Sequence, residues 1–357
     1  MTAKKMIEFT HKPLKAICFG MGAIGTYIGG SLAAHGANVT FIEKKEFIRN
    51  AEASGIHLNI NGHEIHVPKI NITSDVRQAI SGEPADVALL AVKSNDTASV
   101  LDLLTGLENE FPPILCLQNG VENEGLIARK LGEEKVIGGS ITSAVGRSGL
   151  GNIKLEKLRG VGIETGHSIS QTLIDWFNLS GLRAKGYESR ADMKWSKMLT
   201  NLLANATSAI LNWTPAQVYS HPLTWRIELE QIREAMEVMR RMHIHLVDLP
   251  GTPVKPLMLL LKNLPAGMSR NLIGAPLAKG RGEKMPSFHI DLYSGKTTSE
   301  VTYLNGAVSR YASKVGVKSP VNNGLCQLLE QMAIGKISKE QFAGQPEKLD
   351  QWLKRQK

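Results

Sequence analysis

The sequence of 357 residues contains little cysteine, few aromatic residues and no long apolar run. Its three cysteines, Cys18, Cys116 and Cys326, lie far apart in apolar surroundings, a pattern that fits neither a disulfide framework nor a zinc site. No apolar run approaches the ~20 residues that a membrane helix needs, and residues 1–9 lack the apolar core and cleavage site of a signal peptide. These absences predict a protein of the reducing cytoplasm with no membrane partner.

A nucleic-acid partner is not expected either. Lys and Arg (42) outnumber Asp and Glu (33) for a formal net charge of +9, but the basic residues are spread along the chain. Aromatic residues make up 5% of the sequence, too little for a base-stacking surface. This balance favours solvated faces and an anionic small-molecule ligand. The histidine pairs His63/His66 and His243/His245 have no acid or cysteine at ligand spacing, so we expect no metal site.

The chain changes character at about residue 190. Before that point, short β-rich apolar runs alternate with amphipathic stretches, the pattern of a parallel sheet covered by helices. After it, long helical periodicities dominate. The sequence therefore predicts an α/β domain over residues 1–190 and an all-α domain over residues 191–357.

The expected elements follow from these patterns. A hairpin is expected around the Asn61-Gly62 turn, with strands over residues 56–60 and 64–67. The strands of the main sheet are expected at residues 15–19, 37–42, 87–92, 114–117, 136–137 and 161–163. Helices are expected from the glycines after residue 19 to about residue 34, and at 193–211, 223–246, 298–315 and 323–332, with loops and short helices over 250–286.

A glycine-rich loop follows the first expected strand. Its sequence is Gly20-Met21-Gly22-Ala23-Ile24-Gly25, a G-x-G-x-x-G between a strand and a helix. The first glycine permits the tight turn, the second lets a pyrophosphate approach the backbone, and the third allows close packing of the helix on the strand. This context predicts a bound dinucleotide, which makes residues 1–190 a Rossmann-type domain and leaves 191–357 to bind substrate and to dimerise.

The end of the second strand bears on the choice of cofactor. An acid at this position accepts the ribose hydroxyls of NAD, whereas a cation accommodates the 2′-phosphate of NADP. The sequence offers both, as Glu43 followed by Lys44 and Lys45. The lysines favour NADP, with NAD as the alternative because of Glu43.

Polar residues stand where two strands and one helix could form a cleft. Lys93 and Asn119 follow the strands that end at residues 92 and 117, and ligands of open α/β sheets bind at the carboxyl ends of the strands. On the helix expected at 193–211, Lys197, Asn201 and Asn205 recur every four residues and so share one face. Asparagines on an otherwise apolar helix favour a polar ligand as their partner.

These motifs, in their order and spacing, resemble the ketopantoate reductase family (2-dehydropantoate 2-reductase) over nearly the whole chain. The resemblance rests on the glycine loop and on Ala91-Val-Lys93, Gln118-Asn119-Gly120-Val121, Val136-Ile-Gly-Gly139, Lys194-Trp-Ser-Lys197 with Asn201 and Asn205, Pro286-Ser287-Phe-His-Ile-Asp291, Thr298-Ser-Glu300-Val-Thr-Tyr-Leu-Asn305-Gly306 and Ser319-Pro320-Val-Asn322.

The resemblance implies hydride transfer from NADPH to a 2-oxo acid, 2-dehydropantoate, to give the 2-hydroxy acid pantoate. It implies that Lys197 is the general acid, with Glu300 as the second catalytic residue, orienting Lys197 or accepting from a substrate hydroxyl. Substrate binding is implied for Asn119, Asn201, Asn205 and Ser287. Cofactor binding is implied for Gly20, Met21, Gly22, Ala23, Ile24, Gly25, Lys44, Lys93 and Asn119.

The chain departs from the family pattern at three places. Glu43-Lys44 replaces a neutral residue plus arginine, the segment from Asp291 to Glu300 is one residue longer, and His289 and Tyr293 are expected to alter the substrate pocket. Two alternatives therefore stay open: a related reductase of another 2-oxo acid or ketone, and a non-catalytic NADP(H)-binding regulator. The complete set of Lys197, Asn119 and Glu300 argues against the regulator, because a sensor needs no proton donor.

Overall fold

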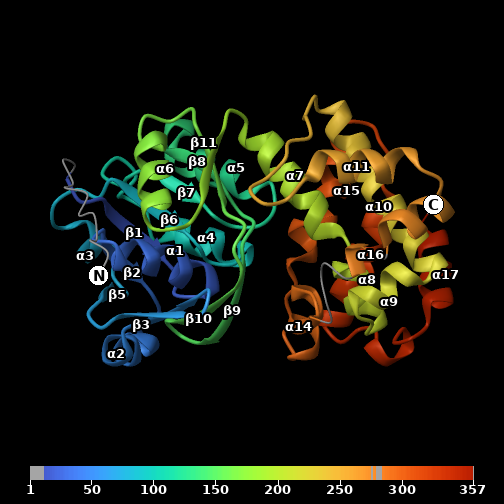
Figure 1. The fold of residues 1–357 in the computed structure, drawn as a ribbon, viewed down its shortest axis with the longest axis horizontal. Helices are drawn as coiled ribbons and strands as arrows, with labels where there is room; N and C mark the ends of the chain where they lie inside the picture. Colours follow the sequence, from blue (N-terminus) through green and yellow to red (C-terminus); the bar gives the residue numbers. More distant parts are fainter. Residues whose placement is uncertain (1–11, 275, 279–283, 357) are drawn as a thin grey trace, which may run out of the picture.

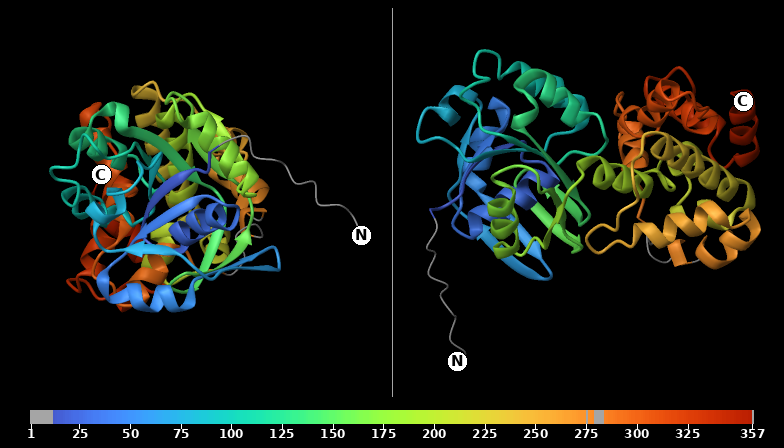
Figure 2. Two further views of the ribbon diagram at one scale, coloured as in Figure 1. Left: turned by 90° about the vertical axis from the view of Figure 1, so that its left-hand side faces the viewer. Right: turned by 90° about the horizontal axis from the view of Figure 1, so that it is seen from above.

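The computed structural model describes residues 12–274, 276–278 and 284–356, and the expectation about residues 1–9 lies outside them. Figure 1 shows a sheet-containing part and a helical part side by side. The last strand of the first part, β12, ends at Tyr187, and the helix α7 (Arg190–Leu202) begins the second part. In Figure 2 this helix crosses from one part to the other. We propose that the chain divides into domains here, at residues 190 and 191.

An eight-stranded sheet forms the centre of the first part. Its strand order is β12-β11-β8-β7-β6-β1-β2-β5, and neighbouring strands are parallel except β8 and β11. The strands are β1 (Lys15–Phe19), β2 (Asn38–Ile42), β5 (Asn71–Thr73), β6 (Val87–Leu90), β7 (Ile114–Cys116), β8 (Val136–Ile141), β11 (Val161–Glu164) and β12 (Ala184–Tyr187). The predicted Rossmann-type sheet is therefore confirmed.

The expected parallel sheet contains one antiparallel pair of neighbouring strands. β11 pairs antiparallel with β8, with Ile141 opposite Val161. A parallel neighbour needs a long crossover connection, usually a helix. Between β8 and β11 the chain instead forms two strands of another sheet, β9 (Ala144–Gly149) and β10 (Asn152–Lys157). It returns from them without a helix and enters the main sheet in the opposite direction.

That second sheet has the order β4-β3-β10-β9. The predicted hairpin is present as β3 (Ile56–Ile60) and β4 (His63–Val67), and β3 pairs in parallel with β10. Alternate residues of β10, Ile153 and Leu155, are buried in the same core as the helix α1 (Ala23–Ala34). The second sheet therefore covers α1, the helix that follows the glycine loop.

Helices cover both faces of the main sheet. One face shares its core with α1 and α6 (Ser170–Leu179), and the other with α4 (Thr97–Asp102) and α5 (Asn123–Leu131). The remaining helices of this part are α2 (Lys45–Ser54), α3 (Val76–Ile80), η1 (Ser94–Asp96) and η2 (Glu133–Lys135).

The helical part packs around α10 (Pro222–Arg241), whose buried residues include Trp225, Ile232 and Met239. Its other elements are α8 (Asn205–Leu211), α9 (Pro215–Ser220), α11 (Val254–Asn263), α12 (Ala266–Ser269), η3 (Arg270–Gly274), α14 (Ser287–Tyr293), η4 (Glu300–Tyr303), α15 (Asn305–Lys314), α16 (Pro320–Ala333), η5 (Lys339–Gln341) and α17 (Pro346–Lys354). No helix in the described ranges is both long and apolar enough to cross a bilayer.

Two predicted helices are interrupted. The helix expected at 193–211 ends as α7 at Leu202, and Ala204 takes a left-handed conformation (φ 53°) before α8 begins. The buried Glu228 carboxylate accepts hydrogen bonds from Ala204 N (2.6 Å) and Thr207 Oγ1 (2.6 Å) at the start of α8. A negative charge at a helix N-terminus is favourable, which explains the new start. Likewise, the helix expected at 298–315 is η4 followed by α15.

We predict that Glu228→Ala lowers the free energy of unfolding by about 3 kcal/mol or more, because it leaves buried donors without their charged acceptor. Chemical denaturation measures this value. The control is Glu237→Ala on the same helix, where an exposed carboxylate pairs with Arg240 and Arg241. The control should change stability little. Equal losses in the two variants would contradict the capping role.

Candidate active site

The carboxyl ends of three adjacent parallel strands bring the predicted polar residues together. β1, β6 and β7 are neighbours in the sheet, and they end at Phe19, Leu90 and Cys116. The glycine loop, Lys93 and Asn119 follow these strands and therefore lie along one edge of the sheet. The helix α7 packs against the adjacent strand β8 and covers this edge from the helical side.

The glycine loop has the geometry that its sequence predicts. Gly20 has φ +90°, a conformation that side-chain-bearing residues rarely adopt. A Cβ on Gly25 would lie 1.9 Å from the Gly20 carbonyl oxygen, so no larger residue fits at that position. Gly22 is the N-cap of α1, and its Cβ position faces open space except for one described side chain, Arg147.

Arg147 was missed by sequence analysis. It lies on β9 of the second sheet, and its Nη1 is 4.0 Å from the Cβ position of Gly22. Nearby, the buried Met21 side chain lies below Gly151, whose Cβ position is 3.4 Å from Met21 Cε. The β9–β10 turn thus covers the glycine loop and places a cation beside it. No sequence signal marked Arg147, because the pairing of β9 and β10 was itself not predicted.

Glu43 is engaged by the backbone. Its Oε2 accepts from Met21 N at 2.8 Å, and its Oε1 accepts from Lys44 N at 2.9 Å. One carboxylate therefore joins the end of β2 to the glycine loop. Lys44 itself is exposed, at the N-cap of α2.

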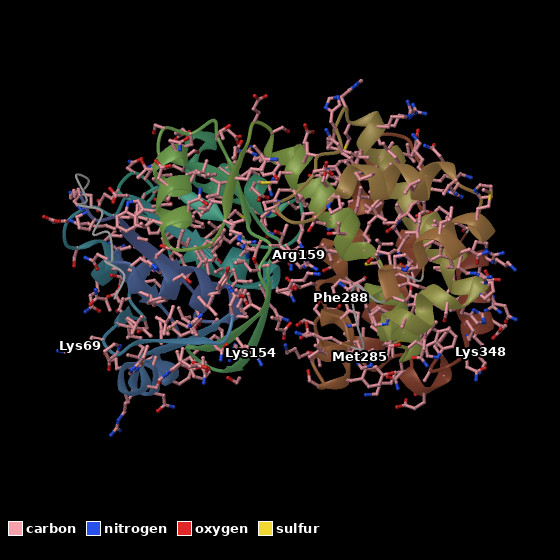
Figure 3. All side chains as sticks on the ribbon, in the orientation of Figure 1. Lys69, Lys154, Arg159, Met285, Phe288 and Lys348 are labelled. Atoms are coloured by element: carbon pink, nitrogen blue, oxygen red, sulfur yellow. The ribbon has the colours of Figure 1, made fainter. Side chains whose placement is uncertain are left out.

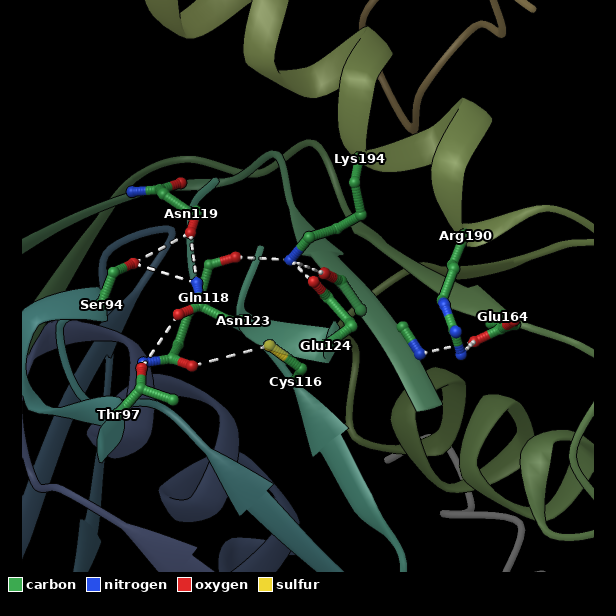
Figure 4. Close-up of polar contacts among 12 residues, drawn as sticks. Ser94, Thr97, Cys116, Gln118, Asn119, Asn123, Glu124, Glu164, Arg190 and Lys194 are labelled. Atoms are coloured by element: carbon green, nitrogen blue, oxygen red, sulfur yellow. Dashed lines mark hydrogen bonds and ion pairs between the residues drawn. The ribbon is translucent and has the colours of Figure 1, made fainter. Parts of the chain in front are cut away.

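Asn119 is fixed by a buried polar network (Figure 4). Its carbonyl oxygen accepts from Ser94 Oγ (3.0 Å) and from Asn123 Nδ2 (2.8 Å). The preceding Gln118 side chain donates to the Val92 carbonyl (3.0 Å) and to Thr97 Oγ1 (2.8 Å). These bonds connect the ends of β6 and β7, while the Asn119 side chain stays exposed.

The two parts meet through amide side chains at this edge. Asn201 Nδ2, near the end of α7, donates to Asn119 Oδ1 at 3.1 Å. Lys197 is four residues before Asn201, so both lie on the same face of α7. Lys197 is half-buried there.

Asn205 does not share that helix face, contrary to the sequence-based expectation. The helix break at Ala204 separates it from α7, and it is buried at the start of α8. Its Oδ1 accepts from Phe288 N at 3.2 Å, which places it beside Ser287, the exposed first residue of α14. Figure 3 shows Phe288 on the helical side of the space between the two parts.

Four charged residues form a second contact between the parts. Lys93 Nζ is 2.6 Å from Asp291 Oδ2, and Lys296 Nζ is 2.5 Å from Asp291 Oδ1. Glu300 is buried next to them, 3.5 Å from Ser94 N. Burial disfavours the charged form of Lys93, but the hydrogen bond to Asp291 raises the pKa of Lys93 overall.

The pKa of Glu300 is raised above its ordinary value, chiefly because burial penalises the carboxylate, while the Lys93 charge partly opposes the rise. Besides burial, three nearby charges act on the pKa of Glu300: Lys93 and Lys296 lower it and Asp291 raises it. The Asp291–Glu300 segment supplies two of these charges.

His289 and Tyr293 lie away from this charge cluster. Their rings stack at 4.2 Å between centroids, His289 Nε2 contacts Asn212 Oδ1 at 2.7 Å, and Lys339 lies over the Tyr293 ring. Each is two residues from Asp291 on α14, so both are on the opposite face of the helix. Among the described residues, no group of three or more His, Cys, Asp or Glu side chains is placed to hold a metal ion.

The observed arrangement defines a class of protein, a Rossmann-type α/β part joined to a helical part, with polar residues of both at the carboxyl edge of the sheet. Family models match accordingly: "ketopantoate reductase PanE/ApbA" over residues 17–166 and its C-terminal model over residues 191–333. The chain belongs to the ketopantoate reductase family, a family of oxidoreductases.

Relatives and solved structures agree with this membership. The chain is 26% identical to a 2-dehydropantoate 2-reductase of Pyrococcus horikoshii, over 87% of this chain and 94% of the relative. It is 24% identical to a 2-dehydropantoate 2-reductase of Lactococcus lactis, over 87% of this chain and 95% of the relative. A ketopantoate reductase structure from Ralstonia eutropha superimposes with a TM-score of 0.74 at 25% identity, over 89% and 98% of the two chains. D-mandelate dehydrogenase with NADH and anilino(oxo)acetate shares the fold, with a TM-score of 0.71 at 22% identity, over 89% and 98%.

We predict that Glu300→Gln raises the thermal unfolding midpoint at pH 8. Because burial raises the pKa of Glu300, charging this group costs the folded state more than the unfolded chain. The cost is present above the folded-state pKa and vanishes below the unfolded value of about 4.3. The difference between variant and wild type should therefore shrink as the pH falls towards 4.

Glu340→Gln is the control for this measurement. Backbone and side-chain hydrogen bonds, the one from Ser338 first, lower the pKa of the exposed Glu340. Its replacement should therefore give no gain at pH 8. A wild type more stable than Glu300→Gln at pH 8 would contradict the prediction.

Proposed function

We propose that the protein reduces the ketone of a 2-oxo acid, 2-dehydropantoate, to the 2-hydroxy acid with NADPH. The observation that carries this proposal is the Asn119–Asn201 hydrogen bond at 3.1 Å. It brings the Lys197 face of α7 to the same sheet edge as the glycine loop. Family membership and the named relatives support the same reaction.

The described residues fit a dinucleotide. The turn at Gly20, the open space over Gly22 and the start of α1 form a cradle for a pyrophosphate, and Arg147 adds a cation beside it. Met21, Ala23, Ile24 and Gly25 complete this loop. When bound, the reduced nicotinamide supplies the hydride.

For the adenosine end, we propose NADP(H) over NAD(H). Both Glu43 oxygens are already used by the backbone N–H groups of Met21 and Lys44. The exposed Lys44 and Lys45 stand at the N-terminus of α2, where the helix dipole also favours an anionic group such as a 2′-phosphate.

The chain's own residues then handle substrate charge and the proton. A ketone oxygen becomes negative as hydride arrives, so the Lys197 ammonium stabilises the transition state more than the ground state and donates the proton. Asn119 and Asn201 offer amide donors at the same place. Ser287 and Asn205 lie together at the start of α14, and we assign them to substrate polar groups.

Lys93 and Glu300 belong to the charge cluster that also contains Asp291 and Lys296. We assign Lys93 to the cofactor and Glu300 to a substrate hydroxyl, since Glu300 is close to Ser94, the hydrogen-bond donor to the Asn119 carbonyl. A second candidate substrate is another 2-oxo acid, because the fold is shared with D-mandelate dehydrogenase.

The proposal also covers partners and location. We place the protein in the cytoplasm, and we propose a homodimer formed through the helical part. Exposed apolar side chains occur there on α11, α12 and η3, namely Leu259, Leu260, Met268 and Leu272.

We predict that Lys197→Ala lowers kcat by about 10²- to 10⁴-fold, the usual contribution of a general acid. NADPH binding, followed by its fluorescence, should stay close to wild type. The decay of NADPH absorbance with a panel of 2-oxo acids, 2-dehydropantoate first, measures the rate. Lys348→Ala, remote on α17 of the helical part, is the control and should retain full activity.

Two results would overturn the proposed function. A wild type that binds NADPH but turns over none of the 2-oxo acids would favour the non-catalytic regulator. An active Lys197→Ala variant would remove the assigned proton donor.

The cofactor assignment predicts that one lysine variant and one arginine variant change cofactor binding in different ways. Lys44→Met should raise the Kd for NADPH about tenfold and leave the Kd for NADH unchanged, because only NADPH carries a 2′-phosphate. Arg147→Met should weaken both cofactors alike, because the pyrophosphate is common to them. Titration of each variant with each cofactor checks both statements. Tighter binding of NADH than NADPH by wild type would assign Glu43 to the ribose instead.

A further inference from the structure

Lys194 is the lysine of the Lys194-Trp-Ser-Lys197 motif that the proposed reaction does not use. It lies in the middle of α7, but its side chain points into the sheet part rather than into solvent (Figure 4). The side chains of Lys194 and Glu124 are only 5% and 6% exposed, and their charged atoms are 2.8 Å apart. A buried ion pair between the two parts is therefore present next to the candidate site.

Three oxygen atoms surround the Lys194 ammonium, two through hydrogen bonds and one through an ion pair. Nζ donates to the Gln118 carbonyl at 2.6 Å and to the Gly139 carbonyl at 3.1 Å, in addition to the Glu124 contact. An ammonium has three donors, and three oxygens surround this one. Burial disfavours its charge, but Glu124 raises the pKa of Lys194 overall, so the residue stays protonated.

The three oxygens come from three segments of the sheet part. Glu124 is on α5, Gly139 is on β8, and Gln118 precedes Asn119 at the end of β7. The Gln118 carbonyl belongs to the peptide unit whose nitrogen is that of Asn119. Lys194 thus holds the backbone of Asn119 directly, while Asn201 holds its side chain from the same helix.

We propose that Lys194 and Glu124 are a positioning pair, which fixes α7 against the Asn119 turn so that Lys197 and Asn119 keep one mutual placement. This inference rests on the proposed function and adds to it. Lys197 is one helical turn beyond Lys194, so the α7 backbone transmits the placement. A displacement of about 1 Å at reacting groups can cost about 100-fold in rate, so such a support matters to catalysis.

The test removes the pair without leaving a buried charge. The double variant Lys194→Met/Glu124→Leu substitutes apolar side chains of similar volume, which buried ion pairs often tolerate. We expect a thermal midpoint near that of wild type, an unchanged Kd for NADPH and a kcat lowered about 10- to 100-fold. With NADPH deuterated at the transferred position, the isotope effect on kcat should rise, because hydride transfer becomes slower than the other steps.

Conservative and control variants separate positioning from stability. Glu124→Gln removes the buried counter-charge and should lower the thermal midpoint, but it keeps an oxygen for Lys194 and should therefore retain wild-type kcat and isotope effect. Arg190→Met removes the more exposed ion pairs of the same helix with Glu133 and Glu164. This variant should also retain wild-type kcat and isotope effect. If the double variant fails to fold, Lys194→Gln/Glu124→Gln replaces it, since two neutral amides leave no buried charge and one glutamine cannot serve three oxygens.

Hydrogen exchange tests the inference independently of turnover. In the double variant, amide exchange at residues 117–121 should accelerate, while the core of the helical part keeps its protection. A double variant with wild-type kcat, isotope effect and exchange would overturn the positioning role. A wild type inactive on every 2-oxo acid would overturn the proposed function, and the exchange result would still decide whether the pair holds the Asn119 turn.

Discussion

A lysine ammonium in the interior of a protein is stable only when oxygen atoms accept from its N–H groups. Lys194 has three such oxygens, from Glu124, Gln118 and Gly139. Because those oxygens belong to the sheet part and the lysine belongs to α7, they also determine how the two parts meet. The placement of α7 relative to the glycine loop depends on that docking. The Asn119–Asn201 bond and the Lys93–Asp291 contact both require it.

The candidate site contains a neutral hydrogen-bond network around Asn119 and a charge cluster around Asp291. On the α7 side, Asn119 is fixed by neutral hydrogen bonds from Ser94 and Asn123, and it presents an exposed amide. At α14, Asp291 forms ion pairs with Lys93 and Lys296. Glu300 is buried nearby, and its pKa is raised. A buried carboxylate that is costly to charge is a frequent feature of functional sites, where stability is lower than the fold could provide.

The second sheet gives the glycine loop a cover that the α/β core alone lacks. The β9–β10 turn brings Gly151 over Met21 and Arg147 beside Gly22. These residues are more than 100 positions from the loop in the sequence, and the pairing of β10 with β3 and of β9 with β10 places them there. The β9–β10 segment thus accounts for two features of the described residues. It precedes the one antiparallel pairing of the main sheet, and it supplies the added cation.

Local sequence was enough to predict much of this protein. The G-x-G-x-x-G after an apolar strand determined the Rossmann-type part, because only glycines satisfy the φ of Gly20 and the contact of Gly25 with the Gly20 carbonyl. The recurrence of Lys197 and Asn201 placed them on one helix face. Tertiary structure decided the rest. The carboxylate of Glu228, 24 residues away from Ala204, ended the helix before Asn205. No sequence pattern indicated that Glu124 and Lys194 would be buried together. Contacts between distant segments leave no periodic signal in the chain, and so only the folded structure shows them.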